Sequence, residues 1–217
     1  PVAGLAAENF VVTEDQQSVS IFESNQSILQ LGLGFELYSH LLLDMSGSIV
    51  SSGNLPDLIT AVQSFITASV TEESGNRVKI SLFDGREFLT TLIDFTTDAA
   101  ALQAAAAGLS TYEVVDPSTN LNGAVIQGVD ILEDAVNDSE AGIKLGALLV
   151  FTDGTDQTGY HPDQSAIDAV AATPHSVFSI GLGGEVNTTV LGALGKDGFE
   201  QAQDGAAIEV AFAAIAA

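Results

Sequence analysis

A carboxylate and two hydroxyls stand at the end of an apolar segment, where an ordinary turn would need only one or two such groups. The segment Leu41–Leu43 runs directly into Asp44, Ser46 and Ser48, in the pattern Asp-x-Ser-x-Ser. Hard oxygen donors of this kind are the ligands that Mg²⁺, Mn²⁺ and Ca²⁺ prefer in proteins. The pattern therefore predicts a divalent-cation site, provided that other parts of the chain supply further oxygen ligands.

Two later segments carry suitable ligands. Thr119 precedes a helical pattern that begins at Leu121, and Asp153 follows the apolar run 147–151. With the first segment they offer two carboxylates and three hydroxyls, enough to hold one ion octahedrally and leave one position for water or a ligand. Each segment alone is also compatible with a helix cap or a turn. Their joint occurrence at the ends of predicted elements favours a metal site.

The rest of the chain predicts elements that would bring these segments together. Apolar strand patterns alternate with helical ones, which indicates a Rossmann-like, doubly wound α/β fold with a mostly parallel sheet and helices on both faces. Asp84-Gly85 predicts a hairpin turn, and hence one antiparallel edge strand. The predicted strands are 35–44, 77–83, 87–95, 145–152 and 176–182, and the predicted helices are 54–66, 99–109, 121–136, 163–172, 188–194 and 206–216. Because ligands bind at the carboxyl ends of such strands, Asp44 and Asp153 are expected at one rim.

The first 34 residues have a different pattern. They lack a helical period, and the segments 9–12 and 18–22 flank the polar residues 14–17 as in a hairpin. We therefore expect two parts, a short strand-rich β appendage or end of a preceding β module over 1–34 and the α/β domain over 35–217. The chain begins at Pro1 without a methionine, which indicates a piece of a longer protein.

The composition narrows the function classes. Five Lys and Arg stand against 29 Asp and Glu, so the formal net charge is −24. This charge repels nucleic acids and anionic lipid, and it is typical of an acidic, salt-tolerant surface. The chain has no cysteine, which excludes disulfides and thiolate metal sites. No uninterrupted apolar stretch of about 18 residues predicts a membrane span.

On the residues Asp44, Ser46, Ser48, Thr119 and Asp153, the chain resembles a von Willebrand factor type A domain of bacterial surface-protein type, with an intact metal-ion-dependent adhesion site. The run 177–183 resembles the last core strand of that family, and the resemblance covers about residues 36–217. It implies that the serines, and sometimes the threonine, touch the metal directly, whereas the aspartates often act through water. Asp116-Pro117-Ser118 replaces the glycines that are common before the family threonine.

The resemblance implies a non-enzymatic adhesion module of a secreted or cell-surface protein. The expected ion is Mg²⁺, with Mn²⁺ or Ca²⁺ as possible substitutes, and a glutamate or aspartate of a protein partner would complete its shell. We expect a monomer that neither binds nucleic acid nor inserts into a membrane. The loops 49–54, 112–120 and 154–162 would set specificity. The expected partner-binding rim is Asn120, Gly154, Tyr160 and His161.

Other functions fit the sequence less well. A haloacid-dehalogenase-like phosphatase would need a second acid where Ser46 stands, and a serine hydrolase would need glycines in place of Asp44 and Ser48. The three histidines, His40, His161 and His175, lack metal-ligand spacing. An intracellular, chelatase-associated assembly factor with the same fold is the main alternative, although the acidic surface and strand-rich start favour an external adhesin.

Overall fold

The computed structural model describes residues 13–14, 17–19, 34–71 and 75–216, and the chain divides into two compact units, Pro1–Leu33 and Gly34–Ala217. In the first unit, β1 (Thr13–Glu14) and β2 (Gln17–Ser18) pair antiparallel. The rest of the predicted hairpin, 9–12 and 20–22, lies outside the described residues. The second unit carries the residues predicted to do chemistry.

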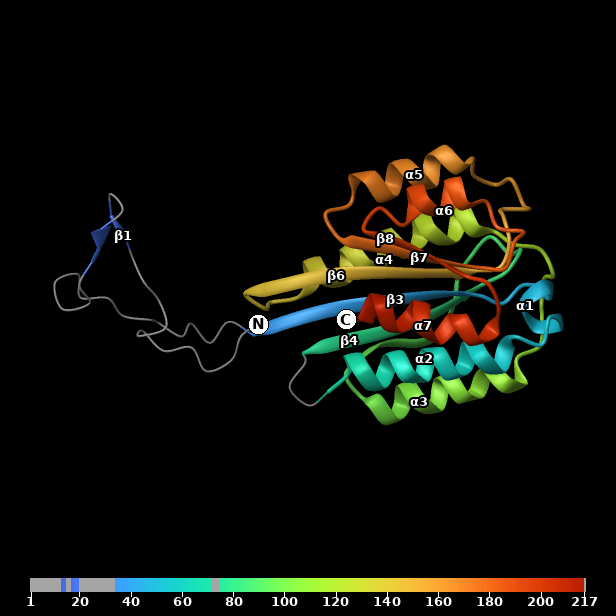
Figure 1. The fold of residues 1–217 in the computed structure, drawn as a ribbon, viewed down its shortest axis with the longest axis horizontal. Coiled ribbons are helices and arrows are strands. Elements are labelled where there is room, and N and C mark those ends of the chain that lie inside the picture. Colours follow the sequence, from blue (N-terminus) through green and yellow to red (C-terminus); the bar gives the residue numbers. More distant parts are fainter. Residues whose placement is uncertain (1–12, 15–16, 20–33, 72–74, 217) are drawn as a thin grey trace. The chain divides into compact units, whose positions relative to one another are not determined.

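The second unit is built on a six-stranded sheet in the order β5-β4-β3-β6-β7-β8 (Figure 1). Only β4 and β5 pair antiparallel, and the other neighbouring strands are parallel. The predicted Rossmann-like fold with one antiparallel edge strand is thus confirmed. The strands are β3 (Phe35–Asp44), β4 (Asn76–Phe83), β5 (Thr90–Thr96), β6 (Ile143–Thr152), β7 (Ser176–Leu182) and β8 (Gly198–Ala202).

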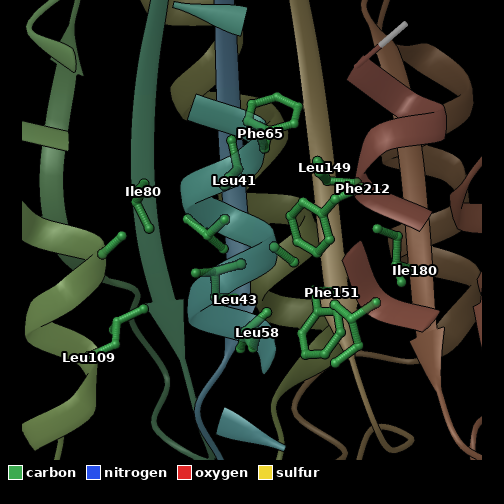
Figure 2. Packing of buried hydrophobic residues seen from close by; sticks show 14 of the residues in the cluster. Leu41, Leu43, Leu58, Phe65, Ile80, Leu109, Leu149, Phe151, Ile180 and Phe212 are labelled. Carbon is green, nitrogen blue, oxygen red and sulfur yellow. The ribbon is translucent and has the colours of Figure 1, made fainter. Parts of the chain in front are cut away.

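Helices cover both faces of this sheet, because its central strands are apolar on both sides. Side chains alternate along β3, so that Leu41 and Leu43 face one core whereas Leu42 faces the other. The first core includes Phe65, Phe151 and Phe212 (Figure 2). It is covered by α2 (Leu55–Ser69), α3 (Ala99–Gly108) and α7 (Gly205–Ala216), and the second core by α4 (Leu121–Asp138), α5 (Asp163–Ala172) and α6 (Thr188–Leu194).

Three local features differ from the sequence prediction. The edge strand β8 and the short helix α1 (Gly47–Ser51) were not predicted. The hairpin predicted at Asp84-Gly85 is present, but its connection is longer than predicted, because β5 begins only at Thr90 and a six-residue loop, 84–89, joins it to β4. Gly85 serves another purpose, since a Cβ there would collide with the Asp116 carboxylate and Ser118 of a neighbouring loop.

The order of the strands creates a switch point between β3 and β6. From β3 the chain continues to β4 on one side, and from β6 it continues to β7 and β8 on the other. The two strands are parallel, so their carboxyl ends meet at one edge, the end at which β3 leads into α1 in Figure 1. Such a switch point is where open α/β sheets bind ligands. None of the described helices is long and apolar enough to cross a membrane.

Candidate metal centre

The register of β3 and β6 brings Asp44 to the switch point. Leu43 pairs with Phe151, so Asp44 lies level with Thr152. The Thr152 hydroxyl donates to Asp44 Oδ2 at 2.6 Å, and the Ser46 backbone N–H donates to Oδ1 at 2.9 Å. Asp44 is completely buried. Two hydrogen bonds therefore hold this carboxylate in one orientation at the end of the strand.

A chain of hydroxyls joins the first segment to Asp153. Ser46 Oγ and Ser48 Oγ lie 3.2 Å apart, and Ser48 Oγ donates to Asp153 Oδ1 at 2.7 Å. Ser46 is the N-cap residue of α1, but its hydroxyl does not cap that helix. The Ser48 side chain thus contacts both Ser46 and Asp153, although 105 residues separate Ser48 from Asp153.

Thr119 reaches the same edge on the loop 112–120. Its side chain is buried, and its Oγ1 lies 4.0 Å from the position that a Cβ on Gly154 would take. Backbone hydrogen bonds fix this loop, from Gln157 N–H to Thr119 O at 2.8 Å and from Gly47 N–H to Pro117 O at 3.0 Å. The structure therefore ties all three predicted segments together.

The alternative role of Thr119 as a helix cap does not apply. Asn120 is the N-cap residue of α4, and its Oδ1 accepts the Gly123 N–H at 3.1 Å. The Thr119 hydroxyl is therefore not committed to the start of the helix.

The two aspartates are placed at an electrostatic cost. Burial raises the pKa of Asp44 from 3.8 to about 6, against the effect of its hydrogen bonds, and the nearby charge of Asp153 adds to the increase. Burial also raises the pKa of Asp153, and the charge of Glu185 acts in the same direction. A completely buried and a partly buried carboxylate favour a nearby cation, because a positive charge lowers the free energy of both ionised groups.

The donors fit a hard divalent cation. Asp44 and Asp153 provide charged oxygens, while Ser46, Ser48 and Thr119 provide neutral ones, which is the chemistry of Mg²⁺, Mn²⁺ and Ca²⁺ sites. In the part of the chain that the structure describes, no group of three or more His, Cys, Asp or Glu has an arrangement suited to a metal. The candidate centre is of a different kind, with two carboxylates and hydroxyl ligands.

The residues predicted as a partner-binding rim have different environments. Tyr160 is 57% exposed, His161 is also exposed, and Gly154 is partly buried. Asn120 is only 2% exposed, and its Nδ2 donates to the Arg86 carbonyl at 3.0 Å. Asn120 therefore holds neighbouring loops together, whereas the other three are open to solvent at least in part.

Two structural contributors were missed from the sequence. Thr152, which orients Asp44, belongs to the Thr-Asp-Gly segment but was not assigned a role. The sequence predicts Asp84 only as a turn residue. In the structure it is buried, it forms an ion pair with Arg86 at 2.9 Å, and its carbonyl accepts the Asn120 N–H at 2.9 Å. The available signal was the position of Asp84 directly after β4, a third strand whose carboxyl end lies at the same edge of the sheet.

Comparisons with known proteins identify the family and the fold. A family model described as von Willebrand factor type A domain matches residues 40–155, more than half of the chain. A comparison with curated protein sequences gives no significant match.

Three similar solved structures illustrate the fold, each with 16% sequence identity and covering 84% of this chain. They are a von Willebrand factor type A protein from Catenulispora acidiphila (TM-score 0.69, 42% of that chain covered), proximal thread matrix protein 1 from the mussel byssus with a zinc-occupied metal-ion-dependent adhesion site motif (0.65, 47%) and the pilus adhesin SpaC from Lactobacillus rhamnosus GG (0.66, 30%). The present chain spans less than half the length of each.

Proposed function

The chain belongs to the von Willebrand factor type A domain family, and from this premise we propose that it is an adhesion-type module that binds a protein partner through a divalent cation. The observation that carries the proposal is the hydrogen-bonded chain from Ser46 through Ser48 to Asp153, beside the buried Asp44, at the switch point of the sheet. A pilus adhesin and a byssus matrix protein with the same fold support an adhesive rather than an enzymatic function.

The five proposed metal ligands have two kinds of role. Ser46, Ser48 and Thr119 hold the ion through their hydroxyls, while Asp44 and Asp153 bind it either directly or through water. The bound ion supplies a positive charge with an open position for an outside carboxylate. A glutamate or aspartate of the partner occupies that position.

The proposed ion is Mg²⁺, with Mn²⁺ and Ca²⁺ as substitutes, because all five ligands offer oxygen. The zinc in the byssus protein supports a divalent ion at this position in the family without defining the one used here. We further propose that the module is monomeric and works outside the cell or on its surface, as part of a longer secreted protein. The net charge of −24 supports a protein partner rather than nucleic acid.

Metal-dependent stabilisation tests this function. We expect Mg²⁺ to raise the melting temperature of the wild-type protein at high ionic strength, where nonspecific binding to surface acids is screened. Asp153→Asn and Ser48→Ala should lose most of this increase. Asp138→Asn is the matched control, because Asp138 is an exposed acid at the opposite end of α4.

Two results would oppose the proposal. The first is an equal increase in melting temperature for the wild-type protein and Asp153→Asn. The second is calorimetry in which Ser48→Ala binds Mg²⁺ as tightly as the wild-type protein does.

A further inference from the structure

Exposed apolar side chains gather in the loops around the candidate metal centre. Among the described residues, six large apolar side chains are strongly exposed, and half of them lie in these loops: Phe88 after β4, Val115 before α4 and Tyr160 after β6. The other three are distributed over the beginning of β6 and the outer face of α7 (Ile143, Leu145 and Val210). Exposed apolar groups on the loops that carry the candidate centre are available to contact a partner that binds there.

Asn120 anchors two of these loops beside the centre. Its Nδ2 donates to the carbonyls of Arg86 and Glu87, at 3.0 and 3.4 Å, and its Oδ1 accepts from Thr158 Oγ1 at 3.4 Å. Phe88 follows Glu87 and Tyr160 lies two residues after Thr158, and both Glu87 and Thr158 are hydrogen-bonded to Asn120. Asn120 directly follows Thr119, a proposed metal ligand. The apolar side chains belong to the same edge as the proposed metal ligands.

A small hollow adjoins Gly154, the residue after Asp153. Its volume is about 80 Å³, and Leu121, Val190 and Leu191 form its apolar side. Its polar side is formed by Thr155, Asp156, Asp163 and Asn187, and the two carboxylates accept hydrogen bonds from Asn122. A cavity of about 150 Å³ is large enough to bind benzene. The hollow therefore suits one aliphatic side chain better than an aromatic ring.

The loops also carry exposed negative charge. Glu87, Glu113 and Glu185 are exposed and come from three different loops. Glu185 lies on the loop after β7, at the same edge of the sheet as Asp153, because β6 and β7 are parallel with Thr152 level with Gly181. Arg86 is the basic residue of these loops, and it is paired with the buried Asp84. A partner that brings several acidic residues would be repelled here, whereas basic residues would be attracted.

We infer that the partner segment presents one carboxylate to the metal, an aliphatic side chain beside it for the hollow at Gly154, and Lys or Arg residues that face the glutamates of the loops. The exposed side chains of Phe88, Val115 and Tyr160 would then contact the apolar parts of the same segment. This inference rests on the proposed function and defines the chemistry of its partner.

Two peptide libraries test the inference. One has a central glutamate with randomised residues on both sides, and the other has glutamine in its place. Both are selected on the wild-type protein, with Mg²⁺ and with a chelator. We expect selection only from the glutamate library with Mg²⁺, and the selected sequences should be rich in Lys or Arg and carry an aliphatic residue next to the glutamate.

The other outcomes separate the two proposals. Metal-dependent selection of glutamate without a preference for basic or aliphatic neighbours would overturn this inference and leave the proposed function in place. Equal selection from both libraries, or selection that ignores Mg²⁺, would overturn both.

Surface variants test the same point from the side of the protein. For a fluorescent peptide of the selected type, replacing the three loop glutamates by glutamine should weaken binding about tenfold, since each exposed charge contributes modestly. A control with the same loss of charge at the far end of α4 should leave it unchanged. The control positions are Asp134, Asp138 and Glu140.

The hollow is tested separately with Val190→Phe. This variant should remove the preference for an aliphatic neighbour while the protein still binds Mg²⁺ in calorimetry. Unchanged peptide affinity in the glutamate variants would overturn the electrostatic part of the inference, and an unchanged aliphatic preference in Val190→Phe would overturn the role of the hollow.

Discussion

Asp44→Asn separates the cost of burying a carboxylate from its role in holding a cation. Asp44 is completely buried, and burial raises its pKa from 3.8 to about 6. The folded state binds a proton on Asp44 more tightly than the unfolded state does. Asp44 therefore stabilises the metal-free protein most at a pH below the pKa that its carboxyl has in the unfolded chain. That contribution is lost as the pH rises through about 6. A shift of roughly two pH units corresponds to about 3 kcal/mol.

The substitution preserves one of the two hydrogen bonds that the Asp44 carboxylate accepts. The asparagine Oδ1 can still accept the Ser46 N–H. Its Nδ2 takes the place of Asp44 Oδ2 and cannot accept the Thr152 O–H, so this hydrogen bond is lost, which costs about 1 kcal/mol of stability. Without metal above pH 7, we therefore expect Asp44→Asn to be more stable than the wild-type protein by about 2 kcal/mol. Below the unfolded pKa, the advantage should disappear.

Urea unfolding of both proteins over a range of pH, in the presence of a chelator, measures this difference. His40 also titrates on unfolding, because burial lowers its pKa from 6.5 to about 3. Its contribution has the opposite sign, since stability is lost as the pH falls below the unfolded pKa. Both proteins retain His40, so its contribution cancels when their free energies of unfolding are subtracted.

Mg²⁺ should reverse the order of stability. At about 100 times its dissociation constant, a ligand that binds only the folded state stabilises by about 2.7 kcal/mol. The wild-type protein should gain this amount and Asp44→Asn should gain little. The reasoning would be refuted if the two metal-free proteins had parallel pH profiles, or if Mg²⁺ stabilised both equally.

Three other substitutions probe the site and its support. Ser48→Ala should weaken Mg²⁺ binding about tenfold or more in calorimetry, because it removes a ligand and the hydrogen bond to Asp153; unchanged affinity would oppose the assignment. Gly85→Ala should lower the free energy of unfolding by about 1–3 kcal/mol through the collision with Asp116, whereas Gly108→Ala, which has open space around it, should not. Phe212→Ala should cost about 3–5 kcal/mol in urea unfolding, and a loss below 1 kcal/mol would contradict its place in the core.

The sequence is most informative about the fold where a strand is buried on both faces. The segment that forms β6 contains the continuous apolar run 147–151, and β3 contains the apolar run Leu41–Leu43, so two buried strands of a mostly parallel sheet could be predicted. β8 is a short edge strand in which Glu200 and Gln201 are exposed, and its composition does not distinguish it from a loop. The five residues of α1 are too few to show a helical period.

The candidate site was predictable only in part. The types and spacing of Asp44, Ser46 and Ser48 indicated hard oxygen ligands, but the hydrogen bond from Thr152 to Asp44 depends on the register between two strands. The burial of Asn120 likewise depends on the loop 84–89, for which the sequence predicted only a hairpin turn at Asp84-Gly85. Local patterns thus identified the chemical groups, whereas contacts between distant segments determine how those groups are held.

A crystal structure of the wild-type protein grown with Mn²⁺ tests the central claim most directly, because the anomalous scattering of manganese locates the ion independently of the protein atoms. The account predicts one strong anomalous peak within coordinating distance of the hydroxyls of Ser46, Ser48 and Thr119, at about 2.0–2.6 Å from its oxygen ligands. Asp44 and Asp153 should lie in its first or second coordination sphere. A map with no peak at this position, or with peaks only at other surface carboxylates, would contradict the account.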